Sequence, residues 1–119
     1  MKDEFITFET AKLAKEKGFD EYCKYHFDQE GARFNNNMNP TKNSEWNNCM
    51  TQPTQSLLQR WLREQHKINI SMINGSNTIN LYYYEINKTN KFPIKGDGSK
   101  NYTYEQALEE SLLKALELI

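Results

Sequence analysis

The sequence predicts a single α+β domain over residues 1–119, with an antiparallel β-sheet of hairpins and about three α-helices packed on one of its faces. Two segments, 51–66 and 103–119, carry apolar side chains at helical spacing. Between them, residues 68–73 alternate strictly, and Asn74-Gly75, the strongest short hairpin signal, precedes a returning strand at 78–86. A chain of 119 residues is also long enough to bury a core without disulfides or metals.

The first helical segment, 51–66, has the densest local signals. Pro53 suits the first turn of a helix, where its missing N–H leaves no bond unmade, and Thr51 is the better N-cap candidate. The apolar stripe at i, i+3, i+4, i+7 and i+8 consists of Thr54, Leu57, Leu58, Trp61, Leu62 and Gln65. We expect this stripe to lie at the centre of the core and His66 to cap the C-terminal end of the helix.

A shorter helix is predicted near the start of the chain, over residues 8–17. Thr7 is placed to cap its N-terminus. Gly18 stands where a residue with left-handed backbone often ends a helix, so Phe19 can fold back onto the last turns.

Residues 21–36 predict a β-hairpin, because aromatic side chains alternate on both sides of a turn at 28–31. A helix over 20–27 is the alternative. The Asn-rich stretch 35–50 is predicted to be an irregular loop, and loops of this length are usually functional or disordered.

Two strands, 68–73 and 78–86, form the later hairpin. A third strand is predicted at 91–95, where Pro93 would confine it to the edge of the sheet, and a turn follows at 96–98.

The last helix begins with a capping box made by Thr103 and Gln106. Leu113 and Leu118 lie off its main apolar stripe. Wide packing within the chain would explain these leucines, and so would a homo-oligomer formed through residues 104–119.

Composition limits the functional classes. The formal net charge is −1, which argues against a strongly electrostatic binder of nucleic acid or membranes. The first residues lack the apolar core of a signal peptide, and no run approaches the roughly 18 apolar residues of a membrane span. We therefore expect a cytoplasmic protein, within a host cell if it is phage-encoded, in which Cys23 and Cys49 are reduced thiols.

No catalytic or metal-binding motif is evident. Cys23, His26, Cys49 and His66 do not stand at ligand spacing, and Cys23 and His26 would point to opposite faces of a strand. The glycines at 96–98 do not form a phosphate-binding loop. The sequence therefore predicts no enzyme, no metal and no cofactor.

The best candidate residues are typical of binding. Arg60, Arg63 and Lys67 share one side of the first long helix, and an uncovered Tyr82 and Tyr84 would make a stacking platform. The alternative is that these arginines pair with glutamates on neighbouring elements and these tyrosines fill a sheet face. Trp46, in the Asn-rich loop, either covers the edge of the core or closes on a ligand as a mobile side chain.

Three segments resemble proteins of one group: residues 10–19, residues 53–64 and residues 104–119. They are similar, in the same order, to segments of small uncharacterised proteins encoded by phages and prophages of gut Bacteroidales. The resemblance implies a phage accessory role and action on host machinery or defence. It implies no particular activity, because the group has no established function.

Three functional hypotheses follow. The first is a non-enzymatic phage or prophage accessory protein that acts by binding, in an anti-defence role, with a host protein or a nucleotide signal as its partner. The second is a nucleic-acid-binding module that uses Arg60, Arg63, Lys67 and the tyrosines, and it is not favoured. The third is a small enzyme of unknown reaction.

Overall fold

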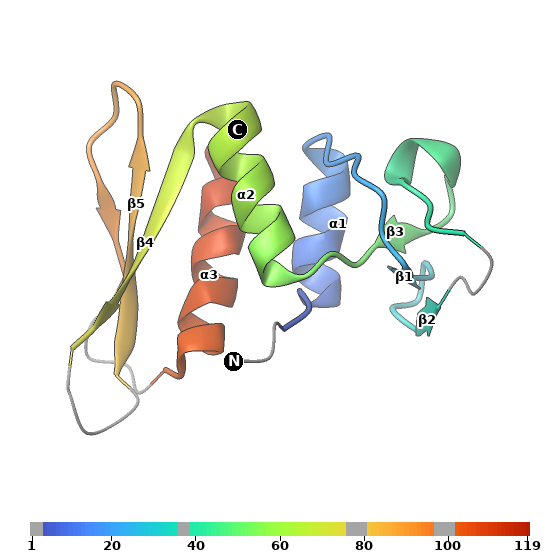
Figure 1. The fold of residues 1–119 in the computed structure, drawn as a ribbon, viewed down its shortest axis with the longest axis horizontal. Coiled ribbons are helices and arrows are strands. Elements are labelled where there is room, and N and C mark those ends of the chain that lie inside the picture. The colour runs from blue at the N-terminus through green and yellow to red at the C-terminus, as the bar shows by residue number, and fades with distance from the viewer. Residues whose placement is uncertain (1–3, 36–38, 76–80, 97–101) are drawn as a thin grey trace. The chain divides into compact units, whose positions relative to one another are not determined.

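The structure is a computed structural model that describes residues 4–35, 39–75, 81–96 and 102–119. It divides into two compact units, Met1–Leu57 and Leu58–Ile119, called here the N-terminal unit and the C-terminal unit. The described residues form three α-helices and two three-stranded antiparallel sheets, so the predicted α+β class is confirmed (Figure 1). Each sheet lies within one unit, and the single domain over 1–119 stays a prediction.

Helix α1, Phe8–Glu16, begins at the predicted residue and ends one residue before the predicted end, with Lys17 as its C-cap. The Thr7 side chain accepts a hydrogen bond from a backbone N–H of the first turn. Gly18 has a φ of +95°, and the N–H of Phe19 donates to the carbonyl of Ala14 over 2.9 Å. This is the Schellman arrangement, and it turns the Phe19 ring into the core of the N-terminal unit.

The N-terminal sheet has the strand order β2-β1-β3, with β1 at Tyr25–Phe27, β2 at Arg33–Asn35 and β3 at Met50–Thr51. Both neighbours run antiparallel to β1, and His26 pairs with Phe34 on one side and Thr51 on the other. The predicted hairpin is therefore confirmed, and the alternative helix over 20–27 is wrong.

The Asn-rich segment is more regular than predicted. It contains a short 3₁₀ helix, η1 at Asn43–Glu45, and it ends in β3. The buried Asn43 side chain orders it, because Nδ2 donates to the Phe19 carbonyl over 2.8 Å and Oδ1 accepts the Thr51 N–H over 3.0 Å. A side chain that satisfies one backbone carbonyl and one backbone N–H can order a loop, as hydrogen bonds between strands do.

Helix α2, Gln55–His66, starts later than predicted. Thr51 lies in β3, Pro53 precedes the helix, and the Thr54 hydroxyl caps it by accepting the N–H of a first-turn residue over 3.2 Å. The reason is tertiary, because Phe5 forms a β-bridge with Thr54 and holds this segment extended.

The apolar stripe of α2 agrees with the prediction at its centre. Leu58 and Leu62 are fully buried and Trp61 is 7% exposed, whereas Gln65 lies in solvent.

The C-terminal sheet has the order β4-β5-β6, with β4 at Ile68–Asn74, β5 at Tyr82–Lys88 and β6 at Ile94–Lys95. Asn74 pairs with Tyr82 and the Gly75 N–H donates to the Leu81 carbonyl over 2.8 Å, so the two strands pair as a hairpin but Asn74-Gly75 is not its two-residue turn. The strand predicted over 78–80 and the turn predicted at 97–98 lie outside the described residues. Strand β6 lies at the edge, as Pro93 predicted.

Helix α3, Tyr104–Glu117, has the predicted capping box, with reciprocal hydrogen bonds of 3.1 and 2.9 Å between Thr103 and Gln106. It lies along one face of the β4–β5 hairpin (Figure 1). The side chains of Tyr84 and Ile86 are buried on this covered face. Leu113 and Leu118 are half-buried.

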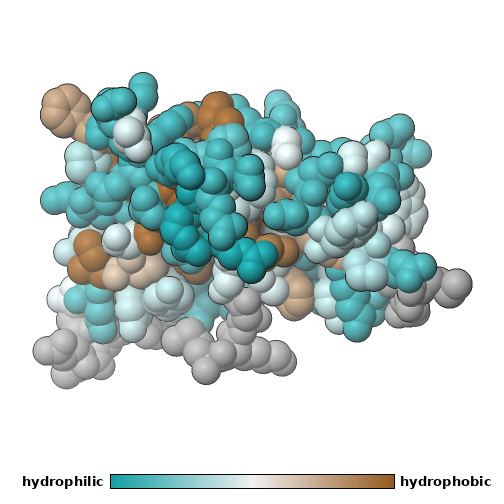
Figure 2. Space-filling view, turned by 45° about the horizontal axis from the view of Figure 1, so that its top comes forward, coloured by the Kyte–Doolittle hydropathy of each residue, from teal (hydrophilic) through white to brown (hydrophobic). Residues whose placement is uncertain are grey.

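The surface is mostly hydrophilic on the face drawn in Figure 2, with scattered hydrophobic patches. Within the described parts of the chain, no helix is both long enough and apolar enough to cross a bilayer.

Candidate functional site

Of the three basic residues predicted on α2, Arg60 and Arg63 lie on the helix, whereas Lys67 follows its last residue and has a φ of +57°. Arg60, Arg63 and Lys67 are all exposed. Arg60 Nε lies 3.9 Å from a carboxylate oxygen of Glu64, one turn along the same helix, and Lys67 Nζ donates to the Glu64 backbone carbonyl over 3.3 Å. Arg60 therefore pairs with a glutamate of its own helix, and not with one on a neighbouring element as the alternative proposed.

The predicted tyrosine platform does not form. Tyr84 is only 4% exposed beneath α3, and burial, together with Glu110, raises the pKa of its phenol. The ring of Tyr82 lies edge-on to Tyr104, with 5.5 Å between the centroids. The prediction failed because α3 covers this face of the sheet, and the alternation within β5 alone could not decide which face would be covered.

Trp46 lies in the N-terminal unit, whereas the other predicted site residues lie in the C-terminal unit. Its side chain is 37% exposed, and its ring centroid lies 5.5 Å from His26 and 5.4 Å from Phe34. These contacts suit a side chain that covers the edge of the core.

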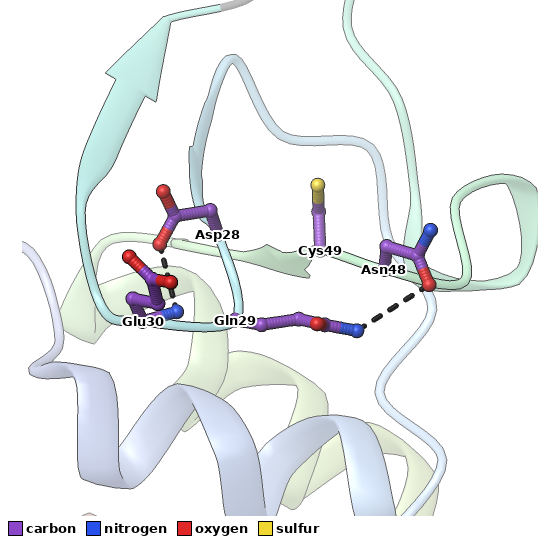
Figure 3. A pocket seen from close by; sticks show the side chains of 5 residues that line it. All are labelled: Asp28, Gln29, Glu30, Asn48 and Cys49. Carbon is purple, nitrogen blue, oxygen red and sulfur yellow. Dashed lines mark hydrogen bonds between the residues drawn. The ribbon is translucent and has the colours of Figure 1, made fainter.

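A site that the sequence did not predict lies in the N-terminal unit. A cavity of about 390 Å³, called here the Asp28 pocket, opens between the β1–β2 turn and the segment before β3 (Figure 3). It is lined by Asp28, Gln29, Glu30, Asn48 and Cys49.

The turn side of the Asp28 pocket is held by hydrogen bonds to the Asp28 side chain. One carboxylate oxygen of Asp28 accepts the backbone N–H groups of Glu30 and Ala32, each over 2.9 Å. Gly31 completes the turn with a φ of +90°. An aspartate that binds the backbone of the following residues fixes both the turn and its own orientation.

The loop side of the pocket is held by a lysine from α1. The Lys15 ammonium donates to the backbone carbonyls of Trp46, Asn47 and Cys49, over 3.1, 2.9 and 2.6 Å. Three charge-assisted hydrogen bonds from one ammonium group place this wall of the pocket against the helix.

Two amide side chains, Gln29 and Asn48, line both the Asp28 pocket and a second cavity. Gln29 Nε2 donates to Asn48 Oδ1 over 3.4 Å, a long bond between exposed side chains (Figure 3). Both residues also line a cavity of about 320 Å³ whose other lining residues are Lys12, Lys15, Glu16, Asn47 and Met50. The Asp28 pocket therefore carries two carboxylates, whereas the second cavity carries two lysines and the Glu16 carboxylate.

The thiol in the Asp28 pocket is not activated. Cys49 is 8% exposed, and burial raises the pKa of its thiol. Two charges have smaller effects on this pKa: the Lys15 ammonium lowers it and the Asp28 carboxylate raises it. Cys23 is also buried, and burial raises its pKa to about 11. A thiolate is the reactive form, so both groups are poor nucleophiles at neutral pH.

Among the described residues, no group of three or more His, Cys, Asp or Glu side chains could hold a metal ion. Burial lowers the pKa of His26, and its Nε2 and the Thr41 hydroxyl form a hydrogen bond.

Only part of this site had a sequence signal. The length of the Asn-rich segment indicated a functional loop, and that segment supplies Asn48 and Cys49. Nothing local indicated that Lys15 would bind carbonyls more than 30 residues away.

No protein family, no curated protein and no solved structure matches this chain. Function is therefore argued from the site itself.

Proposed function

We propose that this protein is a non-enzymatic binding protein whose Asp28 pocket accepts an arginine side chain from a partner protein. The observation that carries the proposal is a pair of carboxylates, Asp28 and Glu30, at a preformed cavity. Within the described ranges, neither Asp28 nor Glu30 forms an ion pair with a basic side chain. A cationic ligand would supply a counter-ion.

Arginine suits this pocket better than lysine. Its planar guanidinium presents donors in a fork that matches a carboxylate, and it is less strongly hydrated than an ammonium group. The protonated thiol of Cys49 gives the pocket an uncharged surface beside the carboxylates.

The amide pair supports a peptide as the source of that arginine. The Gln29–Asn48 bond is long and exposed, so a ligand can replace it without leaving a buried group unpaired. The separated amides would then bind the peptide groups on either side of the arginine, as backbone amides do.

This proposal corresponds to the host-protein arm of the first sequence hypothesis. Phage origin and an anti-defence role remain proposals. Their only support is the resemblance of three segments to phage and prophage proteins. The Arg60, Arg63 and Lys67 surface with its tyrosines is not proposed as a nucleic-acid site, because Tyr84 is buried.

The test is a titration with N-acetyl-L-arginine amide, followed by NMR chemical-shift changes of the backbone amides. The matched probe is N-acetyl-L-citrulline amide, which has the same shape without the charge. We expect the arginine probe to shift signals of residues 28–30 and 48–49 and the citrulline probe to shift them little.

Two variants with the same change of charge complete the test. Glu30→Gln alters the pocket, whereas Glu9→Gln alters an exposed residue of α1 that does not line it. We expect the first to weaken binding of the arginine probe about tenfold and the second to leave it unchanged. Equal binding of the arginine and citrulline probes would refute the proposal.

A further inference from the structure

Arg33 is the starting point for a second site in the N-terminal unit. Its guanidinium carbon lies 4.0 Å from the ring centroid of Tyr25, in the neighbouring strand β1, and 4.6 Å from that of Phe5. The two rings contact each other edge-on at 5.1 Å. A guanidinium held against two aromatic rings has little freedom to rotate away.

Gln52 binds the Nε end of the same guanidinium. Its side-chain oxygen accepts from Arg33 Nε over 2.5 Å, and its side-chain nitrogen donates to the Ile6 carbonyl over 2.9 Å. Its backbone N–H donates to the Tyr25 carbonyl over 2.8 Å. The buried glutamine thus connects the arginine to β1 and to the segment before α1.

These contacts leave the outer end of the guanidinium available. Arg33 is exposed, and within the described ranges its two terminal nitrogens have no hydrogen-bond or ion-pair partner. A second cation lies near the same ring, because Lys24 Nζ is 5.9 Å from the Tyr25 centroid. Arg33 and Lys24 therefore share Tyr25 as a neighbour.

We infer that Arg33 and Lys24 form an anion site for a phosphate-bearing ligand of the nucleotide class. The free edge of the guanidinium provides the two parallel donors that bind phosphate oxygens, and the lysine provides a point charge for another oxygen. Phe5, which is partly exposed beside the guanidinium, offers an apolar surface for a base.

The rigidity of Arg33 strengthens this inference. Ordering a long basic side chain opposes binding, and here the aromatic rings and Gln52 order it before the ligand arrives. An arginine that only stabilises the segment before α1 would make the same contacts. The experiment must therefore measure ligand binding and folding of each variant separately.

Isothermal titration calorimetry at about 50 mM salt, where screening is weak, provides the test. The probes are ATP, AMP and inorganic pyrophosphate, with a short oligothymidylate as the polymer. We expect ATP to bind more tightly than pyrophosphate, because only ATP has a base to lie against Phe5, and AMP to bind more weakly than ATP.

The variants separate the two roles of Arg33. Arg33→Lys keeps the charge but removes the fork, and we expect about tenfold weaker ATP binding with an unchanged circular dichroism spectrum. Lys24→Met removes the second charge from an exposed position and should weaken binding several-fold even if Arg33→Lys does not fold. Arg60→Lys is the matched control in the C-terminal unit and should bind like the wild type.

Three results would overturn the inference: no ATP binding to the wild-type protein, equal ATP affinity in Lys24→Met, or binding of the oligothymidylate alone. Neither Arg33 nor Lys24 lines the Asp28 pocket, so this site and the arginine pocket succeed or fail separately.

Discussion

The two units reach a folded state by different means. In the C-terminal unit, β4 and β5 pair over seven consecutive residue pairs, and α3 covers one face of the hairpin with fully buried side chains such as Leu112 and Leu116. In the N-terminal unit the strands have two or three residues each. Polar side chains there bind backbone groups that strands would pair in a larger sheet. Lys15, Asn43 and Gln52 donate hydrogen bonds to backbone carbonyls of distant segments.

This difference explains where the candidate sites lie. A unit held by long ladders and an apolar core satisfies its backbone internally. A unit held by side-chain hydrogen bonds needs polar groups at its junctions, and such groups line cavities and can bind ligands as well. The Asp28 pocket and the Arg33 site both lie at junctions of this kind.

The two tryptophans give the largest expected contrast between the units. Trp61→Ala removes a nearly buried indole from the C-terminal unit and should lower the free energy of unfolding by roughly 3–5 kcal/mol. Trp46→Ala removes a side chain that is 37% exposed and should have a clearly smaller effect. Urea denaturation followed by far-UV circular dichroism measures both, and equal losses would contradict the contrast.

The second prediction concerns the hydrogen bonds of the N-terminal unit. Asn43→Ala leaves the Phe19 carbonyl and the Thr51 N–H without their buried partner, so the free energy of unfolding should fall by roughly 2–4 kcal/mol. Asn48→Ala, which removes only an exposed bond to Gln29, should change it by less than about 0.5 kcal/mol. If both alanine variants were equally stable, side-chain hydrogen bonds would not hold this unit together.

The same contrast explains how much of the structure the sequence could predict. The start of α1, the turn after it and the start of α3 were correct because their signals act within a few residues, as in the Gly18 turn and the Thr103 capping box. The start of α2 was wrong because Phe5, far away in the chain, holds Thr54 extended. Local patterns do not contain such contacts.

The candidate site was less predictable than the fold. Alternation identified the two faces of β5 but could not say that α3 would cover the face of Tyr84. The pocket depends on Lys15, whose partners are carbonyls that any residue possesses, so no residue type marks them in the sequence. The Arg33 site likewise depends on rings from two separate segments.

Substitution of one glycine in each unit compares two causes of lost stability, a steric contact and a strained backbone. A β-carbon added at Gly96, in the C-terminal unit, would lie 2.5–2.9 Å from three atoms of the buried Tyr84 ring, so Gly96→Ala should lower the free energy of unfolding by about 2 kcal/mol. Gly18 has open space around it but a φ of +95°, so Gly18→Ala should lower it by about 1 kcal/mol through backbone strain alone.

A second substitution at each glycine separates the two causes. Gly18→Asn should recover part of the stability, because asparagine tolerates left-handed backbone, whereas Gly96→Asn should be no better than alanine. Thermal denaturation of the four variants measures this, and recovery at Gly96 would show that the contact with Tyr84 is not the constraint.

The smallest expected effect is a loss of stability in mild acid, to which each unit contributes one histidine. Burial lowers the pKa of both His26 and His66, and Lys88 lowers that of His66 further. Below the unfolded pKa of about 6.5, the unfolded chain binds protons more readily than the folded chain, so stability is full above that pH and declines as the pH falls through it. Urea denaturation of wild type and His66→Gln above and below pH 6.5 measures the decline in stability, and NMR titration of the histidine C–H signals gives the pKa of each histidine.

His26 is almost fully buried beside Phe34 and Trp46, whereas His66 is partly exposed at the end of α2. His66→Gln should therefore retain most of the decline in stability. Loss of the decline in that variant would place the acid-sensitive group in the C-terminal unit and would mean that the polar N-terminal unit tolerates protonation of its buried histidine.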